Sequence, residues 1–411
     1  MLEIRKRNTI VALDIGTSYI KAAMAEVIVG QDINLLGISR VPSRGMRKGN
    51  IVDIESAAKA VEACLNDLER LTGIEINNAV LGFSGGSISS LNNHAAVAIG
   101  NPNSEISRDD KERVLQSAHS ISLPADKTIV QTVERQYIVD GYEGVMDPVG
   151  MVGSRLEAEV TIITAATAAI QNLYRCASRV NLHINSLLYN SLLAGEAVLV
   201  PAEKEMGVVL VDIGAGTTDV AFFENGSLAD TSVIPMGDEY LAKDLAIVLK
   251  TSMEEAARIL EKSGAANPKT VDSELMINVR NIQGKDVKQV PQETIAEIIS
   301  ARLIELVELI YAELKEFDCL DRIPSGIVLT GGGAEMSGIV ELFEQYLDMP
   351  VRIGLPENLR GMAREFNRTQ YAVVLGGVLY GTRVMGNHAK EAPLFTGFLD
   401  RILDWLKDLF R

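Results

Sequence analysis

Two acidic residues, Asp14 and Asp212, each follow a short apolar run and precede a cluster of glycine with threonine or serine. Around Asp212 the sequence Gly207 to Gly226 reads GVVLVDIGAGTTDVAFFENG. Glycines let backbone N–H groups converge on an anion, and threonines add hydroxyl donors. A carboxylate that ends a buried strand suits Mg²⁺, which takes one or two carboxylates together with substrate phosphates. The pattern predicts a phosphate-binding turn, or alternatively a glycine-rich hairpin turn with an incidental aspartate. The candidate phosphate ligands are Gly214, Gly216, Thr217 and Thr218.

The segment around Asp14 repeats this pattern. Thr9 to Val27 reads TIVALDIGTSYIKAAMAEV, with the same strand, turn and returning strand, and Asp14 lies 198 residues before Asp212. Two related hairpins in one chain indicate a duplicated fold in which each half brings one turn to a shared cleft. We therefore expect the metal ion to sit between Asp14 and Asp212. The candidate phosphate ligands of this turn are the backbone N–H groups of Gly16, Thr17, Ser18 and Tyr19 and the ammonium group of Lys21.

Hairpins of buried strands must position these turns. Val208–Val211 and Val220–Phe223 are β-branched and aliphatic runs, typical of a sheet covered on both faces. Asn225-Gly226 predicts a tight turn, because both central positions require positive φ. After the first hairpin, we expect a third strand of a meander from Asp32 to Val41 and a helix over Asp53–Leu71, capped by glycine.

The composition limits which classes of protein the chain can belong to. The chain has 411 residues, 47% of them hydrophobic and 23% charged, which suits two large globular domains with insertions. Its net charge of −16 argues against a nucleic-acid partner, which would call for a basic surface. Cys64, Cys176 and Cys319 lie far apart and form no CxxC pair, so they indicate neither a zinc site nor a disulfide framework.

A different pattern interrupts each half. Short strands and a helix from Ser107 to about Ser120 follow Ser84, and an apolar strand, Thr161–Ala166, resumes the parent pattern. A Gly376-Gly377 pair predicts a helix that packs closely on its neighbour. The expected division is 1–83 with 162–200 for the first domain, 84–161 for its insertion, 201–235 with 292–386 for the second domain, 236–291 for its inserted lobe, 387–395 for a linker and 396–411 for a terminal amphipathic helix.

A third glycine cluster, Gly331, Gly332 and Gly333, follows the predicted strand Ile327–Leu329. Three successive glycines suit the close approach of a flat ligand at a helix N-terminus. The alternative is a loop that merely ends the strand.

The two Asp-Ile-Gly turns, their spacing and this cluster resemble the superfamily of actin, sugar kinases and large heat-shock chaperones. Within it the chain is identified as a member of the FtsA family of bacterial cell-division proteins. The supporting features are the segment GFSGGSISSLNNHAAVAI, the phrase RQYIVDG and a short amphipathic C-terminal segment. The resemblance covers essentially the whole chain. It implies an actin-like (ribonuclease H-like) duplicated α/β fold with a displaced subdomain, and Mg²⁺ and ATP in the cleft with Gly331–Gly333 against the nucleotide.

The resemblance also implies partners. We expect self-polymerisation into filaments, tethering of the tubulin-like FtsZ ring to membrane lipids, and contacts with other divisome proteins. The acidic C-terminal tail of FtsZ is expected to dock on the lobe 236–291, where Arg280, Lys285 and Lys288 give a basic edge. Solvated surface charge is the alternative for each of these residues. The implied location is peripheral, on the cytoplasmic side of the cell membrane at the division site.

The sequence departs from its relatives beside the adenosine. Where several of them have an acidic residue and a lysine, this chain has Ala257 and Leu260. Either Glu254, Glu255 or Arg258 substitutes, or adenine is held mainly by backbone and apolar contacts. The further candidate nucleotide ligands are Gly237 and Arg258.

A second departure concerns hydrolysis. Where chaperones and the cell-shape actin place a carboxylate that orients the attacking water, this chain has Asn190. An amide can orient water but accepts no proton. We therefore expect a slow ATPase at most, with no firm catalytic residue and Asn190 as the candidate that orients water.

Residues 396–411 predict an amphipathic helix. At about 100° per residue, its apolar side chains occupy an arc of about 160° and its charges the remainder. The segment is too short to span a bilayer but suits lying in its interface. Packing of the same face on the protein's own core or on a second copy is the alternative. The expected lipid contacts are Phe398, Leu399, Ile402, Leu403, Trp405, Leu406, Leu409 and Phe410.

Two rival functions share the phosphate turns. A sugar-kinase-type phosphotransferase would need an acidic base in its substrate cleft and gives no reason for the terminal segment. A pilus-assembly ATP-binding protein of the same fold also lacks that segment. The sequence therefore favours an ATP-binding, polymer-forming adaptor over a metabolic enzyme.

Overall fold

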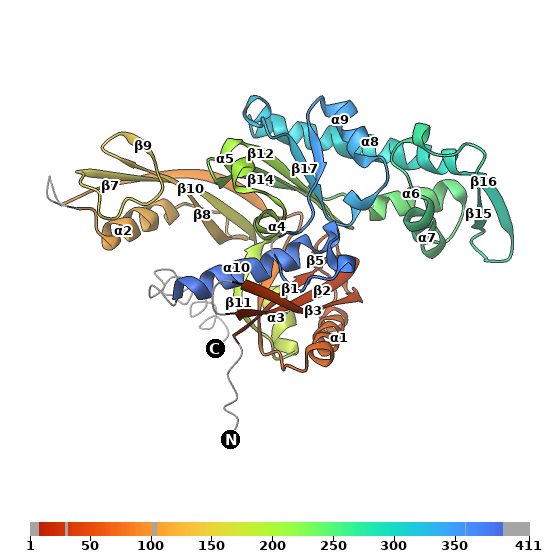
Figure 1. Ribbon diagram of the computed structural model, residues 1–411, viewed down its shortest axis with the longest axis horizontal. Coiled ribbons are helices and arrows are strands. Elements are labelled where there is room, and N and C mark those ends of the chain that lie inside the picture. The colour runs from red at the N-terminus through yellow and green to blue at the C-terminus, as the bar shows by residue number, and fades with distance from the viewer. Residues whose placement is uncertain (1–7, 29–31, 101–104, 358, 389–411) are drawn as a thin grey trace, which may run out of the picture.

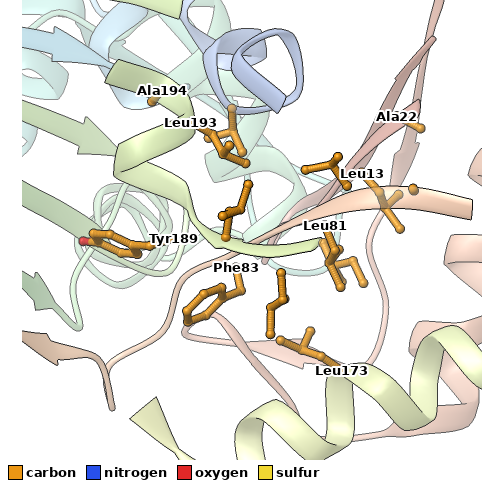
Figure 2. Packing of buried hydrophobic residues seen from close by; sticks show 14 of the residues in the cluster. Leu13, Ala22, Leu81, Phe83, Leu173, Tyr189, Leu193 and Ala194 are labelled. Carbon is orange, nitrogen blue, oxygen red and sulfur yellow. The ribbon is translucent and has the colours of Figure 1, made fainter. Parts of the chain in front are cut away.

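The computed structural model describes residues 8–28, 32–100, 105–357 and 359–388. Two sheets dominate these residues, one below the other in Figure 1, and helices cover both. Helix α4 (Asn190–Val198) lies between the sheets, where its Leu193 and Val198 share one hydrophobic core with Leu13 and Leu81 of the smaller sheet and Leu210 of the larger. Figure 2 shows part of this packing around Leu13, Leu81 and Leu193.

The smaller sheet has the strand order β11-β6-β1-β2-β3. β1, β2 and β3 form the predicted antiparallel meander, and β6 and β11 continue the sheet parallel to β1. Leu13 packs with side chains of α1 and α3, whereas its neighbour Ala12 packs with Leu375 of α10 on the opposite face. The elements are β1 (Thr9–Ile15), β2 (Tyr19–Ile28), β3 (Asp32–Pro42), β6 (Asn78–Phe83), β11 (His183–Tyr189), α1 (Ile54–Thr72), α3 (Thr167–Arg179) and α10 (Ala372–His388).

Local signals explain the bounds of two helices. The Asp53 carboxylate accepts hydrogen bonds from the N–H groups of Glu55 and Ser56, which starts α1, and Gly73 ends it with φ 71°. A Cβ atom at Gly376 of α10 would lie 1.7 Å from the Leu193 carbonyl oxygen, so α10 packs on α4 as closely as the glycine pair predicted. α10 runs to His388, past the expected start of the linker at 387.

The larger sheet has the order β18-β17-β12-β13-β14-β7-β10-β8-β9. Its first five strands repeat the smaller sheet, with a meander flanked by two parallel strands. This repeat confirms the predicted duplication. The strands are β12 (Val208–Ile213), β13 (Thr218–Glu224), β14 (Ser227–Ile234), β17 (Ile327–Thr330), β18 (Val351–Ile353), β7 (Ser89–Ala98), β8 (Lys127–Val139), β9 (Tyr142–Val145) and β10 (Arg155–Ala166).

The segment between β6 and β11 of the smaller sheet adds strands to the larger sheet. β7 pairs with β14 through Ser89 and Ser232, and β10, β8 and β9 follow in the same sheet, with α2 (Arg108–His119) against them. The strand expected to begin at Thr161 begins at Arg155, because β10 pairs with β7 and β8 along nearly its whole length. The sequence predicted an insertion here but not which sheet it would join.

Helices of the second half pack on the other face of β12 and β13. At the right end of Figure 1, α6, α7 and a two-stranded sheet form the lobe. None of the described helices combines the length and apolar character needed to cross a membrane. The remaining elements are α5 (Pro201–Met206), α6 (Glu239–Leu249), α7 (Met253–Ser263), α8 (Gln292–Glu316), α9 (Ile339–Leu347), β4 (Met46–Arg47), β5 (Asn50–Ile51), β15 (Met276–Arg280), β16 (Val287–Pro291), η1 (Pro268–Thr270), η2 (Leu320–Arg322), η3 (Gly333–Glu335), η4 (Arg364–Phe366) and η5 (Thr369–Tyr371).

Candidate functional site

A cavity of about 680 Å³ lies between the two halves, a size typical of small-molecule sites. Both predicted turns and the third glycine cluster line it, although they come from three separate parts of the chain. The structure therefore brings together most of the residues singled out in the sequence: Asp14, Gly16, Thr17, Ser18, Tyr19, Lys21, Asn190, Asp212, Gly214, Gly216, Thr217, Gly331, Gly332 and Gly333.

The first turn joins β1 and β2. Asp14 and Lys21 face each other across this hairpin, with the Lys21 Nζ atom 3.2 Å from Asp14 Oδ2. Arg40 on β3 pairs in register with Lys21, and its guanidinium lies 3.5 Å from the centre of the Tyr19 ring. Arg40 also lines the cavity. Sequence reasoning missed it, although its register opposite Lys21 on the predicted third strand was a usable signal.

The turns of the two halves touch each other. Thr17 Oγ1 accepts a hydrogen bond from the Gly49 N–H at 3.0 Å. A Cβ atom at Gly216 would lie 2.6 Å from that same oxygen and 2.9 Å from Lys48 Cα. Glycine at 216 is therefore required by the contact between the halves.

Two predicted ligands brace the second turn and do not line the cavity. Thr218 Oγ1 donates to the Met236 carbonyl oxygen at 2.8 Å. A Cβ atom at Gly237 would lie 2.3 Å from the Gly214 carbonyl oxygen, and the next residue, Asp238, donates its N–H to that oxygen. Close packing of the α6 start on the turn explains why Gly237 is needed there.

The third glycine cluster packs on the strand that carries Asp212. Gly331 has φ 84°, and a Cβ atom there would lie 2.2 Å from Asp212 Oδ1. A Cβ atom at Gly333 would lie 2.4 Å from Ile213 Cγ2. Thr369 Oγ1 fixes the cluster by donating to the Gly331 carbonyl oxygen at 2.6 Å. The glycines therefore let a third segment reach the cavity wall beside Asp212.

Asp219, which sequence reasoning left without a role, is a buried cavity residue. It pairs in register with Asp212 and accepts hydrogen bonds from Ser84 Oγ at 2.6 Å and the Tyr189 hydroxyl at 3.1 Å. In Figure 2 the Tyr189 ring lies near Phe83 and its hydroxyl points away from the apolar cluster. Burial, with the nearby Asp212 carboxylate, raises the pKa of Asp219 to about 8. Its position as the last residue of the turn motif was the available sequence signal.

The cavity is acidic. Among the described residues its lining holds seven carboxylates and three cationic side chains, Lys21, Arg40 and Arg368. Burial raises the pKa of Asp212 to about 6, although Lys21 opposes this. Burial and the neighbouring Glu239 raise the pKa of Asp238, another residue the sequence reasoning missed, to about 7. No three metal-ligating side chains cluster in the described ranges. A polyphosphate would therefore need a divalent cation to offset the repulsion of these carboxylates.

Asn190 is the first residue of α4, and it lines the cavity. Its Oδ1 atom is buried without a hydrogen-bond partner among the described residues. An unpaired polar atom in a cavity wall is a place for an ordered water or a ligand.

Contrary to expectation, the structure does not bring Arg258 to the cavity. Its Nε and Nη2 atoms donate to the Glu255 carboxylate at 2.8 and 2.7 Å, and Nη2 also donates to the Asn278 carbonyl oxygen. The i, i+3 spacing lets the two side chains meet, and Glu255 also accepts the Arg280 N–H, so the pair lies against β15. The residues of α7 that line the cavity are Ala257, Leu260 and Glu261, and Gly264 lines it just after the helix.

Two other predicted surfaces lie away from the cavity. Arg280, Lys285 and Lys288 are exposed on and between β15 and β16 at the right end of Figure 1. The eight residues expected to contact lipid, from Phe398 to Phe410, lie outside the described residues.

Comparisons with known proteins agree with this geometry. A family model described as "Cell division protein FtsA" matches residues 209–376, and one described as "SHS2 domain inserted in FTSA" matches 85–164. The cell division protein FtsA of Pseudomonas aeruginosa is 37% identical over 419 residues, covering 100% of both chains.

Solved structures match the fold at low identity. The PilM-PilN type IV pilus biogenesis complex matches with a TM-score of 0.65 and 15% identity, covering 90% of this chain and 98% of that one. MreB5 of Spiroplasma citri matches with a TM-score of 0.55 and 13% identity, covering 94% and 99%. The fold is the actin-like one that the resemblance implied.

Proposed function

The chain belongs to the FtsA family of cell-division proteins, and from that premise we propose that it is an ATP-binding, polymerising adaptor that tethers the FtsZ ring to the inner face of the cytoplasmic membrane. The pairing of two glycine-threonine turns across one cavity is the observation that carries the nucleotide part of this proposal. Family membership favours this role over pilus assembly or sugar phosphorylation.

The residues present fit Mg²⁺-ATP. Both glycine-threonine turns and Lys21 line the cavity, and Asn190 leaves an unpaired atom in its wall. Backbone N–H groups of the two turns and Lys21 would hold phosphates, and Asp14 and Asp212 would hold the metal ion. When bound, Mg²⁺ supplies positive charge between the carboxylates and the phosphates. The similar fold of MreB5 has been solved bound to ADP and to AMPPNP.

The same geometry favours ATP as a conformational ligand. A ligand that contacts both turns stabilises the arrangement in which Gly216 lies against Thr17. Asn190 can orient a water, but its amide accepts no proton, so hydrolysis is slow.

Exposed apolar side chains at both ends of the molecule support polymerisation. Tyr142 and Met146, on and after β9, are 76% and 64% exposed, and Ile282, between β15 and β16, is 73% exposed. These elements lie at opposite ends of Figure 1. A contact between unlike ends of neighbouring copies leaves both outer ends free and builds an open filament.

The lobe offers a surface for an acidic peptide. Ile247 and Val248 at the end of α6 are exposed, and the Thr251 hydroxyl donates to the Arg280 carbonyl oxygen, which joins this surface to the basic edge. Cations beside exposed apolar side chains suit the acidic C-terminal tail of FtsZ. Membrane attachment through 396–411 and recruitment of further divisome proteins complete the proposed role.

Calorimetric titration with Mg²⁺-ATP tests the cleft. Asp14→Ala and Asp212→Ala should each weaken binding strongly, because each removes a carboxylate from the metal site. Glu62→Ala, an exposed carboxylate on α1, is the control and should bind as the wild type does. Wild-type affinity in both aspartate variants would show that the cleft assignment is wrong.

A further inference from the structure

The short hairpin formed by β4 and β5 extends from the first half toward the second. A two-residue turn, Lys48-Gly49, joins its strands, and both turn residues have positive φ, 50° and 73°. The base of the hairpin is fixed to the start of α1, because a Cβ atom at Gly45 would lie 2.3 Å from the Asp53 carbonyl oxygen. The hairpin is therefore a short arm that belongs to the first half.

The tip of this arm contacts an aromatic ring of the second half. The Lys48 Nζ atom lies 5.4 Å from the centre of the Tyr240 ring, within the range of a cation–π attraction. The Arg302 guanidinium lies 5.9 Å from the same ring, and its Nε and Nη2 atoms donate to the Asp244 carboxylate at 2.6 and 3.0 Å. Arg302 and Asp244 both belong to the second half, so Lys48 is the cation that links this ring to the first half.

Both sides of this contact are attached to the predicted phosphate turns. On the first half, the Gly49 N–H donates to Thr17 Oγ1 at 3.0 Å. On the second half, the N–H group of Glu239, in the first turn of α6, donates to the Ala215 carbonyl oxygen at 3.0 Å. The contact at the tip of the hairpin therefore forms when the two turns lie together.

The two side chains of the contact do not reach the cavity itself. Among the described residues, neither Lys48 nor Tyr240 lines it, and both are partly exposed. They can therefore act on a ligand in the cavity only through the position of one half relative to the other.

We propose that the β4–β5 hairpin is a latch that slows release of the nucleotide, with the Lys48 ammonium group on the Tyr240 ring as the contact that holds the two halves together. The inference rests on the proposed binding of ATP. A contact that forms only when the halves meet stabilises the closed state, and a ligand enclosed there leaves after that contact breaks. A cation over a partly exposed ring shifts such an equilibrium about twofold to fivefold.

Stopped-flow displacement on the full chain tests this. The protein is loaded with Mg²⁺ and a fluorescent N-methylanthraniloyl derivative of ATP, and excess ATP then displaces the derivative. Lys48→Met and Tyr240→Leu should each release it about twofold to fivefold faster than the wild type and bind it no more slowly, because binding requires the open cleft. The double variant should release it no faster than the faster single variant, because both substitutions remove the same contact. Tyr240→Phe keeps the ring and should release it at the wild-type rate.

Tyr311→Leu is the matched control. The Lys315 Nζ atom lies 4.4 Å from the centre of the Tyr311 ring, but both residues belong to α8, so this variant should keep the wild-type release rate. The inference is overturned if either single variant releases the derivative at the wild-type rate, if the double variant shows the product of the two single effects, or if Tyr240→Phe releases it as fast as Tyr240→Leu. A wild type that binds no derivative would instead overturn the proposed function, and this inference with it.

Discussion

Replacing Gly216 by alanine should weaken ATP binding by obstructing the contact between the two halves. The added Cβ atom would lie 2.6 Å from Thr17 Oγ1 and 2.9 Å from Lys48 Cα, both in the other half. The Thr17 oxygen accepts the Gly49 N–H, and Lys48 Cα is backbone, so neither atom can move without shifting its segment. Gly216 does not have positive φ, so alanine is compatible with its own backbone conformation.

The size of the effect follows from this overpacking. A methyl group forced into a filled contact costs about 1–3 kcal/mol. If ATP binds only when the two turns meet, that cost appears as about fivefold to 150-fold weaker binding. Titration calorimetry with Mg²⁺-ATP measures the change directly.

Gly86→Ala provides the matched control. A Cβ atom at Gly86 would lie 3.6 Å from Pro235 Cβ, which is ordinary contact, so this variant should keep wild-type affinity. If Gly216→Ala also binds Mg²⁺-ATP within about twofold of the wild type, the halves do not close on the nucleotide as reasoned.

Two further predictions concern the cavity. Because burial and Glu239 raise the pKa of Asp238 to about 7, its side chain is mostly neutral below that pH and charged above it. The charge of Asp238 repels phosphate, so ATP affinity should fall as pH rises through about 7, and Asp238→Asn should make this decline smaller, leaving the part due to Asp212 and Asp219. A pH profile of Asp238→Asn that matches that of the wild type in calorimetry would contradict this. Asn190 accepts no proton, so steady-state phosphate release should stay well below about 1 s⁻¹, and turnover at ordinary kinase rates would revive an enzymatic role.

Local signals in the sequence predicted much of this structure. Asp53 and Gly73 mark the two ends of α1, because a capping residue acts on its own helix end. Both hairpin turns lie where glycine follows a buried aspartate. Gly376 was correctly expected to allow close helix packing, whereas Gly216 and Gly331 were singled out as nucleotide ligands and also prove to allow close contacts within the protein.

Contacts between distant segments could not be predicted in this way. The insertion joins the larger sheet through one pairing, Ser89 with Ser232, which no local pattern records. Arg258 was expected at the cavity, but it lies with Glu255 against β15, where its Nη2 atom donates to the Asn278 carbonyl oxygen. The hydrogen bonds of Asp219 could not be predicted, because its partners Ser84 and Tyr189 belong to the first half of the fold.

Sedimentation of the purified full chain with vesicles of anionic lipid, with and without Mg²⁺-ATP, tests the central claim most directly. We expect the chain to sediment with the vesicles and, with ATP, to form filaments on them that electron microscopy detects. Trp405→Glu should abolish vesicle binding and leave ATP binding intact, because apolar burial dominates attachment of an interfacial helix. A wild-type chain that stays in the supernatant, or a Trp405→Glu variant that still sediments with lipid, would contradict the account of a membrane-tethering adaptor.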